Sequence, residues 1–520
     1  MKFLVPFFLL FFLPHIVSAS EVEYLNASSA YDYLNHIRKN LGMNPLRNNR
    51  ILEKSAKNHA RYLIQNPLSH YQNPNRASFT GKTPADRAIF EGYHSKLVTE
   101  NFSSGQGDAI ASIDGLMSAI YHRFGFLDFS QNEVGIGIAD SDSGPRYVYN
   151  MGNDILNDLC KKEDFEPISS SYYSTLCDQE KKIPADIFDQ AEKQIPQLNP
   201  EVIVWPQNGA NDISPVFYDE MPDPLPDLVV SGYPVSIQFN HSKFKYIKLI
   251  QFKLYQIGIK DTLVKTRLLT HKNDPNQKFT KFQFALFPFK RLDWNSRYKV
   301  KATFNLDGKK FVKTWEFSTR KFNQPIFHVS GEKELINLRP GNDAIIYIPP
   351  KKSLPFIRDL NWNSYPNVEA FVSWEDQNTL RIHVKGEECD EVLFKLDGNR
   401  SFKVVLAEKN NWNKGQIYNK THAIECTPPE IKGLLGFFIS GSGETMYVDN
   451  GTSYWIETKT EDNTFNDIVS TCLKGTKVSV KVIRKNIILV TINGAPGNIV
   501  DFNYRGNRSF TLVINENQKP

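Results

Sequence analysis

The chain has 520 residues and a mass of 59.6 kDa, which predicts several domains at roughly 150 residues per domain. Hydrophobic residues make up 40% and charged residues 23%, with a mean hydropathy of -0.41, which excludes a disordered chain, a collagen and a polytopic membrane protein. The 62 Lys and Arg against 57 Asp and Glu give a net charge of +5 without a long basic run. Charge therefore gives no indication of a nucleic-acid partner.

Residues 1–19 predict a secretory signal peptide. Lys2 is followed by an apolar run over residues 3–13 and by the small-residue pattern Val17-Ser18-Ala19. The run is too short to span a bilayer, and no later stretch approaches the ~18 apolar residues that a membrane helix needs. We expect a mature chain that begins near Ser20, has no transmembrane segment and acts in the medium, at the cell surface or in the periplasm.

The cysteines fit an oxidising compartment. They are Cys160, Cys177, Cys389, Cys426 and Cys472. Cys160 and Cys177 are close in sequence and predict one local disulfide, whereas a bridge between Cys426 and Cys472 is the weaker alternative. Five is an odd number, so one thiol remains. No spacing matches a zinc ribbon or a redox CxxC pair.

The first part of the chain alternates between helix and strand patterns. Apolar spacing predicts helices that begin at the capping box of Ser29, at residue 50 and near residue 108. Strand patterns follow over residues 133–138 and 146–150. These elements predict an α+β domain over residues 22–153, with a polar linker carrying the local disulfide over residues 154–198.

The rest of the chain is rich in strand patterns. Residues 199–320 predict an Ig-like antiparallel β-sandwich. Residues 378–408 align without gaps on residues 486–516, and Gly398-Asn-Arg-Ser-Phe402 recurs as Gly506-Asn-Arg-Ser-Phe510. We therefore expect two copies of one β-rich module over residues 325–408 and 435–516. The shared glycine predicts a hairpin turn with positive φ, in preference to a ligand site at Arg400 and Arg508.

Convergent polar motifs gather in the first domain. In chain order they are His70, Lys82-Thr-Pro-x-x-Arg-Ala with Gly92-Tyr93, Glu100-Asn101, His122-Arg123 and Val134-Gly-Ile-Gly137. With these motifs, residues 30–152 resemble the CAP superfamily of cysteine-rich secretory, antigen 5 and pathogenesis-related 1 proteins, and especially its bacterial SCP-like branch. The resemblance implies an α-β-α sandwich whose cleft displays two His and up to two Glu.

Three of the family's four cleft residues have counterparts by position. They are His70, His122 and Glu100. The second family Glu falls near Ala119, and Leu116 stands where the family has a helix Trp. These two positions depart from the family pattern.

Helical arithmetic separates the histidines. His122 lies off the apolar stripe of its helix and can face a cleft, whereas His59 lies within an apolar stripe and is expected in the core. Two imidazoles and the Glu100 carboxylate form the ligand set of an open zinc site. The alternative is that His70 and His122 hydrogen-bond Glu100 and brace the cleft.

The sequence favours a secreted binding or interaction protein whose cleft, lined by His70, Glu100 and His122, holds a small ligand, a metal ion such as zinc, or a peptide. The partner would be an extracellular or envelope ligand. The alternative is a metal-assisted hydrolase of peptide or cell-wall substrates with Glu100 as ligand or base, so enzymatic activity stays open. A third hypothesis is attachment to glycans or surfaces by residues 325–520. The acidic residues Asp219, Glu220, Asp223 and Asp227 are interpreted as an exposed linker rather than a cation site.

Overall fold

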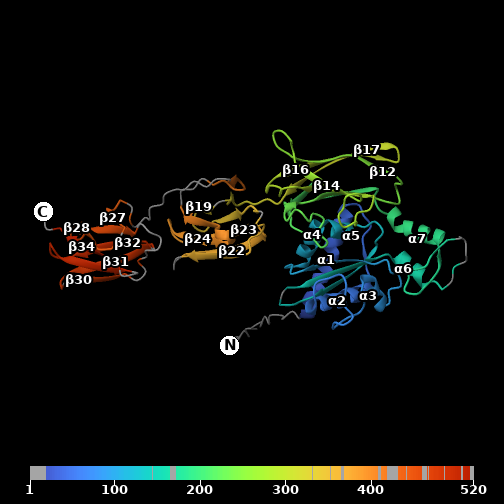
Figure 1. The fold of residues 1–520 in the computed structure, drawn as a ribbon, viewed down its shortest axis with the longest axis horizontal. Helices are drawn as coiled ribbons and strands as arrows, with labels where there is room; N and C mark the ends of the chain where they lie inside the picture. Colours follow the sequence, from blue (N-terminus) through green and yellow to red (C-terminus); the bar gives the residue numbers. More distant parts are fainter. Residues whose placement is uncertain are drawn as a thin grey trace, which may run out of the picture. The chain divides into compact units, whose positions relative to one another are not determined.

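The computed structural model describes residues 19–515 except 143, 164, 166–170, 331, 352, 365–367, 408–411, 419–430, 432, 441, 459–464, 466–467, 473, 485 and 505–507. The predicted signal peptide therefore lies almost entirely outside the described residues. The chain divides into two compact units, Met1–Lys321 and Phe322–Pro520. Each unit is described by itself (Figure 1).

The N-terminal domain of the first unit has five helices and four strands among its described residues. They are α1 (Ala19–Asn40), β1 (Arg47–Asn48), α2 (Arg50–Gln65), α3 (Pro84–Phe90), β2 (Thr99–Ser104), α4 (Ala109–Ser118), α5 (Ile120–Phe126), β3 (Glu133–Ala139) and β4 (Arg146–Gly152). The sheet order is β1-β3-β4-β2, with β1 parallel to β3 and the other pairs antiparallel. Buried residues of α1 and α4 pack with one set of β3 and β4 side chains, and α2 packs on the other face. The domain is a three-layered α-β-α sandwich.

Two glycines of β3 let α2 approach the sheet. A Cβ atom on Gly135 would lie 2.0 Å from the backbone nitrogen of Glu53. A Cβ atom on Gly137 would lie 2.1 Å from the backbone nitrogen of Lys57. Both distances are far below van der Waals contact, so the Val-Gly-Ile-Gly motif is a packing requirement of this helix on this strand.

The predicted helices agree with the structure in part. The helix from residue 50 is confirmed, since α2 is Arg50–Gln65 and Asn49 caps it through hydrogen bonds from the backbone amides of Ile51 and Leu52. The first helix begins at Ala19, so the predicted start at Ser29 is wrong. The third is broken at Ala119, whose backbone is extended at φ -79° and ψ 119°. That break makes α5 a separate short helix, which carries His122.

The segment after the N-terminal domain is more ordered than the predicted linker. It contains α6 (Asp154–Lys161), the short strands β5 (Tyr172–Tyr173) and β6 (Ile183–Pro184), and α7 (Ala185–Gln197). A disulfide joins Cys160 and Cys177, as predicted, and both cysteines lie in a small apolar cluster with residues of α6 and α7. Cys426 lies outside the described residues, but Cys472 carries a free exposed thiol, so the predicted bridge between these two is wrong.

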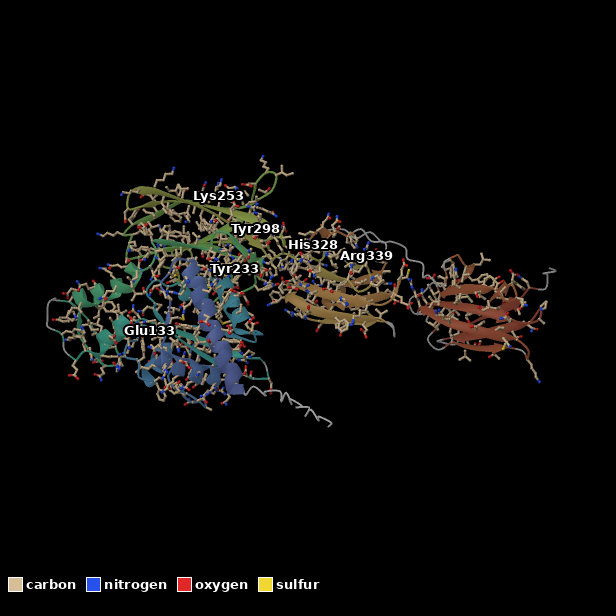
Figure 2. The ribbon with its side chains drawn as sticks, turned by 180° about the vertical axis from the view of Figure 1, so that it is seen from behind. Glu133, Tyr233, Lys253, Tyr298, His328 and Arg339 are labelled. Carbon is tan, nitrogen blue, oxygen red and sulfur yellow. A yellow bond between two sulfur atoms is a disulfide. The ribbon has the colours of Figure 1, made fainter. Side chains whose placement is uncertain are left out.

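A β structure with two larger sheets and the two-stranded sheet β10-β9 completes the first unit. Its strands are β7 (Val202–Trp205), β8 (Ala210–Ile213), β9 (Val216–Phe217), β10 (Ser231–Gly232), β11 (Val235–Phe239), β12 (Ile247–Gln256), β13 (Thr262–Leu263), β14 (Thr266–Thr270), β15 (Gln283–Pro288), β16 (Arg297–Leu306) and β17 (Lys309–Thr319). The larger sheets have the orders β14-β15-β11-β7 and β13-β12-β16-β17-β8. One continuous apolar core contains residues of both sheets and of α1 and α4. Tyr233, labelled in Figure 2, belongs to this core and donates a hydrogen bond of 3.1 Å to the carbonyl oxygen of Met117.

Apart from the short 3₁₀ helix η1 (Asp397–Asn399), the regular elements described in the second unit are strands. The first half has β18 (Ile326–His328), β19 (Glu332–Leu338), β20 (Asp343–Tyr347), β21 (Leu360–Ser364), β22 (Glu369–Asp376), β23 (Thr379–Lys385), β24 (Glu391–Leu396), β25 (Ser401–Leu406) and β26 (Ile417–Tyr418). The second half has β27 (Gly436–Ile439), β28 (Glu444–Val448), β29 (Ser453–Thr458), β30 (Val469–Cys472), β31 (Lys477–Arg484), β32 (Ile487–Asn493), β33 (Ile499–Tyr504) and β34 (Arg508–Ile514).

The two halves have matching strand orders. The orders β22-β23-β20-β18-β26 and β19-β25-β24-β21 in the first half correspond to β31-β32-β29-β27 and β28-β34-β33-β30 in the second, except for the added edge strand β26. Gly398 has φ +65°, as its turn position predicts, and Gly506 lies outside the described residues. Arg400 is 2% exposed and donates to Asp397 at 2.7 Å, so its side chain braces this turn.

Candidate functional site

Glu100 is the buried centre of the predicted cleft. Its side chain on β2 is fully buried, and its Oε1 atom lies 3.0 Å from Nδ1 of His70, in the loop after α2. Its Oε2 atom accepts a hydrogen bond of 2.6 Å from Nη2 of Arg87, a buried residue of α3. Arg87 also donates to the backbone carbonyl of His70 at 3.0 Å. The ion pair thus fixes both the carboxylate and the loop that carries His70.

The charges around Glu100 keep it ionised. Burial by itself raises the pKa of this carboxyl, but His59, Arg87 and the hydrogen bond from His70 together outweigh burial and lower its pKa to about 2. The side-chain amide of Asn150 completes the site when its nitrogen donates to Oε2 at 3.0 Å. Both carboxylate oxygens are therefore held by protein donors.

His59 lies in the core, as its helical position predicts. The ring is fully buried on α2, its Nε2 atom lies 3.1 Å from the carbonyl oxygen of Ser69, and its Nδ1 atom lies 3.0 Å from Nε2 of Gln72. Burial lowers the pKa of His59 to about 4, and Arg87 adds to this effect against the opposing charge of Glu100. His59 is neutral at pH 7, and its positive charge acts on Glu100 only below about pH 4, where Glu100 itself titrates.

His122 has a carboxylate partner from the β structure. Its Nδ1 atom lies 2.9 Å from Oε2 of Glu220, a side chain only 2% exposed on the loop between β9 and β10. Glu220 also accepts hydrogen bonds from the backbone amides of Ile120 at 2.5 Å and Tyr121 at 3.1 Å. These bonds cap the first turn of α5, whose N-cap residue Ala119 offers no side-chain cap.

The two predicted histidines lie side by side. Their ring centroids are 6.1 Å apart with an angle of 28° between the planes, and the rings of Phe102 and His70 form a T-shaped pair with a centroid distance of 4.6 Å. The His70 side chain is 31% exposed and that of His122 is 13% exposed, so solvent reaches both rings. Within the described part of the chain, no group hydrogen-bonds the Nε2 atom of either ring.

The donor set allows a test of the predicted zinc site. Both rings have Nδ1 bonded to a buried carboxylate, which is the usual support of a metal-ligating histidine. The two carboxylate oxygens of Glu100 contact His70 and Arg87. In this geometry Glu100 supports the His70 ring and does not itself face a metal position. In the part of the chain that the structure describes, no group of three or more His, Cys, Asp or Glu side chains is arranged to hold a metal ion. Of the three predicted ligands, only His70 and His122 have a ring nitrogen that no described group engages.

Sequence analysis did not find Glu220. It placed this residue in an exposed acidic linker, but the side chain is buried against α5, 98 residues away from His122 in sequence. No local pattern could have joined the two segments, because the contact depends on how the β structure packs on the N-terminal domain. Asp227 fits the linker interpretation better, since it is exposed and pairs with Arg267.

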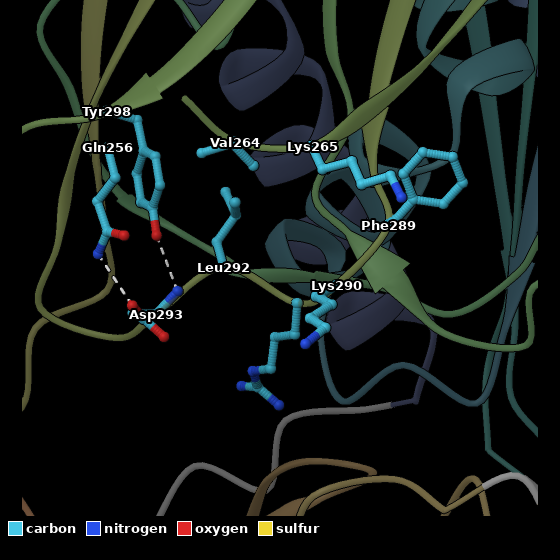
Figure 3. A pocket seen from close by; sticks show the side chains of 9 residues that line it. Gln256, Val264, Lys265, Phe289, Lys290, Leu292, Asp293 and Tyr298 are labelled. Carbon is cyan, nitrogen blue, oxygen red and sulfur yellow. Dashed lines mark hydrogen bonds between the residues drawn. The ribbon is translucent and has the colours of Figure 1, made fainter. Parts of the chain in front are cut away.

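Two cavities lie away from His70 and His122. One, of about 180 Å³, lies in the β structure, where Gln256 donates to Asp293 and the backbone amide of Asp293 donates to Tyr298 (Figure 3). A larger cavity of about 380 Å³ lies between α1 and the β7–β8 loop, near the hydrogen bond from Tyr33 to Asp114. Neither cavity includes the His70 and His122 pair.

Comparison with known proteins identifies the N-terminal domain. Residues 31–151 match the profile of the Cysteine-rich secretory protein family, CAP. An extracellular SCP-domain protein of Bacillus anthracis str. Ames is 22% identical over 26% of this chain and 42% of its own, with a TM-score of 0.23. An outer surface protein of Borrelia burgdorferi is 21% identical over 25% of this chain and 92% of its own, with a TM-score of 0.23.

This chain therefore spans less than half of the Bacillus anthracis protein. No curated protein matches it. The family match and the three-layered fold agree on the same residues. The N-terminal domain of this chain is a CAP domain, and a long β-rich region follows it.

Proposed function

We propose that the CAP domain is a binding module whose cleft holds its ligand through the Nε2 atoms of His70 and His122. The observation that carries this proposal is that each ring has Nδ1 bonded to a buried carboxylate. A carboxylate can only accept, so Nδ1 carries a proton in both rings, and in its neutral form each ring offers a lone pair at Nε2. Two such lone pairs on adjacent, solvent-accessible rings suit a shared ligand.

A divalent cation such as Zn²⁺ is the simplest occupant. Imidazole nitrogen is a preferred ligand of zinc, copper and nickel ions, and the carboxylates would hold the two rings in place. His70 and His122 would hold the ion, and its remaining positions would be open to water, a small molecule or a peptide group. When bound, the ion would polarise an oxygen atom of such a ligand.

The hydrolase alternative finds less support in the geometry. A general base works best with a pKa near the working pH, and the charges around Glu100 lower its pKa to about 2. Its two oxygens are also engaged by His70 and Arg87. Glu100 is therefore better suited to orient a ring than to remove a proton, and binding is the stronger proposal.

We further propose that the chain is exported and works outside the cytoplasm. The signal-like residues 1–19 support export, and the disulfide between Cys160 and Cys177 fits an oxidising compartment. The described residues contain no helix that is long and apolar enough to cross a membrane. Among similar structures, one protein is described as extracellular and one as an outer surface protein.

We propose that the β-rich region displays the CAP domain to its partner. We propose an Ig-like sandwich over residues 199–320 and a duplicated module over residues 325–408 and 435–516. The matching strand orders of the two halves support the duplication. An extracellular or envelope ligand is the proposed partner.

The test is zinc binding by the purified full chain. Isothermal titration with Zn²⁺ should show one site per chain, and His70→Ala and His122→Ala should each abolish it. His271→Ala is the matched control, because this histidine is exposed on the β structure. Absence of a site in the wild type, or a site that survives both cleft variants, would contradict the proposal.

A further inference from the structure

We propose that Glu220 of the β structure is a positioning residue of the CAP cleft, which holds His122 in the tautomer and orientation that its ligand requires. This inference rests on the proposed function. If Glu220 has this role, the neighbouring β structure contributes a residue to the binding site and does not only support the CAP domain.

The first argument is the direct contact between the two side chains. Oε2 of Glu220 lies 2.9 Å from Nδ1 of His122, and the carboxylate is 2% exposed. An ionised carboxylate has no proton to donate, so the hydrogen in this contact belongs to Nδ1. In its neutral form, the His122 ring is thereby left with a lone pair on Nε2.

The second argument is the correspondence between the two histidines. His70 has the same relationship to Glu100 that His122 has to Glu220, with Nδ1 to carboxylate distances of 3.0 and 2.9 Å. Both carboxylates are buried, and the two rings stack. The N-terminal domain supplies one of these carboxylates and the β structure supplies the other.

The third argument is that Glu220 is held in place by the contact between the two domains. Ile120 and Phe124 of α5 pack in one buried cluster with Phe217 and Leu225, which precede and follow Glu220. Such packing fixes the loop from both sides. Because the loop is fixed, the contact between Glu220 and His122 restricts the rotation of the His122 ring in the ligand-free protein.

Hydrogen bonds around Tyr121 also help to hold the Glu220 loop in place. The hydroxyl of Tyr121 donates to Asp274, and Nδ2 of Asn276 donates both to this hydroxyl at 3.1 Å and to the carbonyl oxygen of Asp223 at 2.6 Å. These bonds connect α5, the Glu220 loop and the segment between β14 and β15. Glu220 therefore belongs to an ordered contact between the two domains and not to a solvated linker.

A purely structural role is the competing explanation, because Glu220 also caps α5. Glu220→Gln separates the two roles. The glutamine carbonyl oxygen can still accept from the backbone amides of α5, while its NH₂ group would face Nδ1 of His122 and favour the opposite tautomer. A cap alone would leave the tautomer unchanged.

The experiment uses the full chain and two readouts. Isothermal titration with Zn²⁺ measures affinity, and ¹⁵N NMR of histidine-labelled protein reports which nitrogen of His122 carries the proton, assigned by the His122→Ala spectrum. We expect Nδ1–H in the wild type, the Nε2–H form in Glu220→Gln, and zinc affinity lowered by about 10- to 100-fold in that variant. Asp219→Asn is the matched control, since this neighbouring carboxylate is exposed, and it should behave as wild type.

The outcomes separate this inference from the proposed function. Wild-type affinity and an unchanged tautomer in Glu220→Gln would overturn the role of Glu220 and leave the cleft proposal intact. Absence of zinc binding in the wild type would overturn the proposed function, and the tautomer would then decide the role of Glu220 alone. If Glu220→Gln does not fold, the wild-type spectrum still decides, because a proton on Nε2 of His122 contradicts the inference.

Discussion

Asn101 donates a hydrogen bond of 2.8 Å from Nδ2 to the backbone carbonyl oxygen of His122. Its neighbour on β2, Glu100, holds the ring of His70. Two adjacent residues of one strand therefore fix the side chain of one cleft histidine and the backbone of the other. This relationship gives the Glu-Asn motif a physical role in the site.

Asn101→Asp tests that role. Asn101 is 3% exposed, and aspartate has nearly the same shape but no proton to donate to the His122 carbonyl. We expect the free energy of unfolding to fall by about 3 kcal/mol, since a buried acceptor loses its partner and a charge is buried. Urea denaturation measures the change. Asn75→Asp, at an exposed loop position, should cost less than about 0.5 kcal/mol, and equal losses would contradict this account.

Arg87→Met should be among the most damaging substitutions in the domain. It removes the hydrogen bond of 2.6 Å to Glu100 and leaves that carboxylate buried without its cation. Breaking a buried ion pair from one side costs about 3–5 kcal/mol. The same change at Arg61, which is exposed on α2, provides the control. Chemical denaturation that ranks the two variants equally would show that the ion pair does not stabilise the fold.

His59 predicts a pH dependence of stability. Its pKa is lowered from 6.5 to about 4 in the folded chain, so the unfolded chain takes up a proton first as the pH falls. The stability that neutral His59 contributes is present above pH 6.5 and is lost between pH 6.5 and 4, by on the order of 3 kcal/mol. Urea denaturation across this window should show a shallower slope for His59→Gln than for wild type. His271→Gln should keep the wild-type slope, and identical slopes in both variants would rule out His59 as the source.

Gly137→Ala should displace α2 from the sheet. The added Cβ atom would lie 2.1 Å from the backbone nitrogen of Lys57, and backbone cannot move aside as a flexible side chain can. We expect a loss of about 3 kcal/mol or more in the free energy of unfolding. Gly107→Ala is the control, because nothing lies within 4 Å of the added atom. A small effect at Gly137 would mean that the helix has room to shift.

The disulfide between Cys160 and Cys177 should stabilise the segment around α6 and α7. It closes a loop with a sequence separation of 17, for which chain entropy predicts about 3 kcal/mol. Replacing both cysteines by alanine should increase hydrogen exchange and proteolysis within residues 154–198. Cys472→Ala removes a free thiol and should change neither. Unchanged protection in the double variant would contradict a stabilising role of the bridge.

Local sequence patterns were sufficient for several features. The apolar stripe over residues 50–65 predicted α2, and the same stripe placed His59 in the core. The close cysteine spacing predicted the one disulfide whose two cysteines are both described. The ordered motifs identified the CAP domain, and the family match covers residues 31–151. These features depend on neighbours in the chain or on short-range periodicity, which a sequence displays directly.

The site itself required the tertiary structure. His70 and His122 were predicted to line one cleft, but the partner of each ring depends on residues distant in sequence. Arg87 reaches Glu100 because α3 packs beside β2, and Glu220 reaches His122 across 98 residues because the β structure packs on α5. From the sequence alone, a carboxylate in an acidic stretch is expected to be exposed to solvent, and only the tertiary packing shows that Glu220 is buried. The sequence thus determined which side chains are available for the chemistry, and only long-range packing decided which carboxylate orients which histidine.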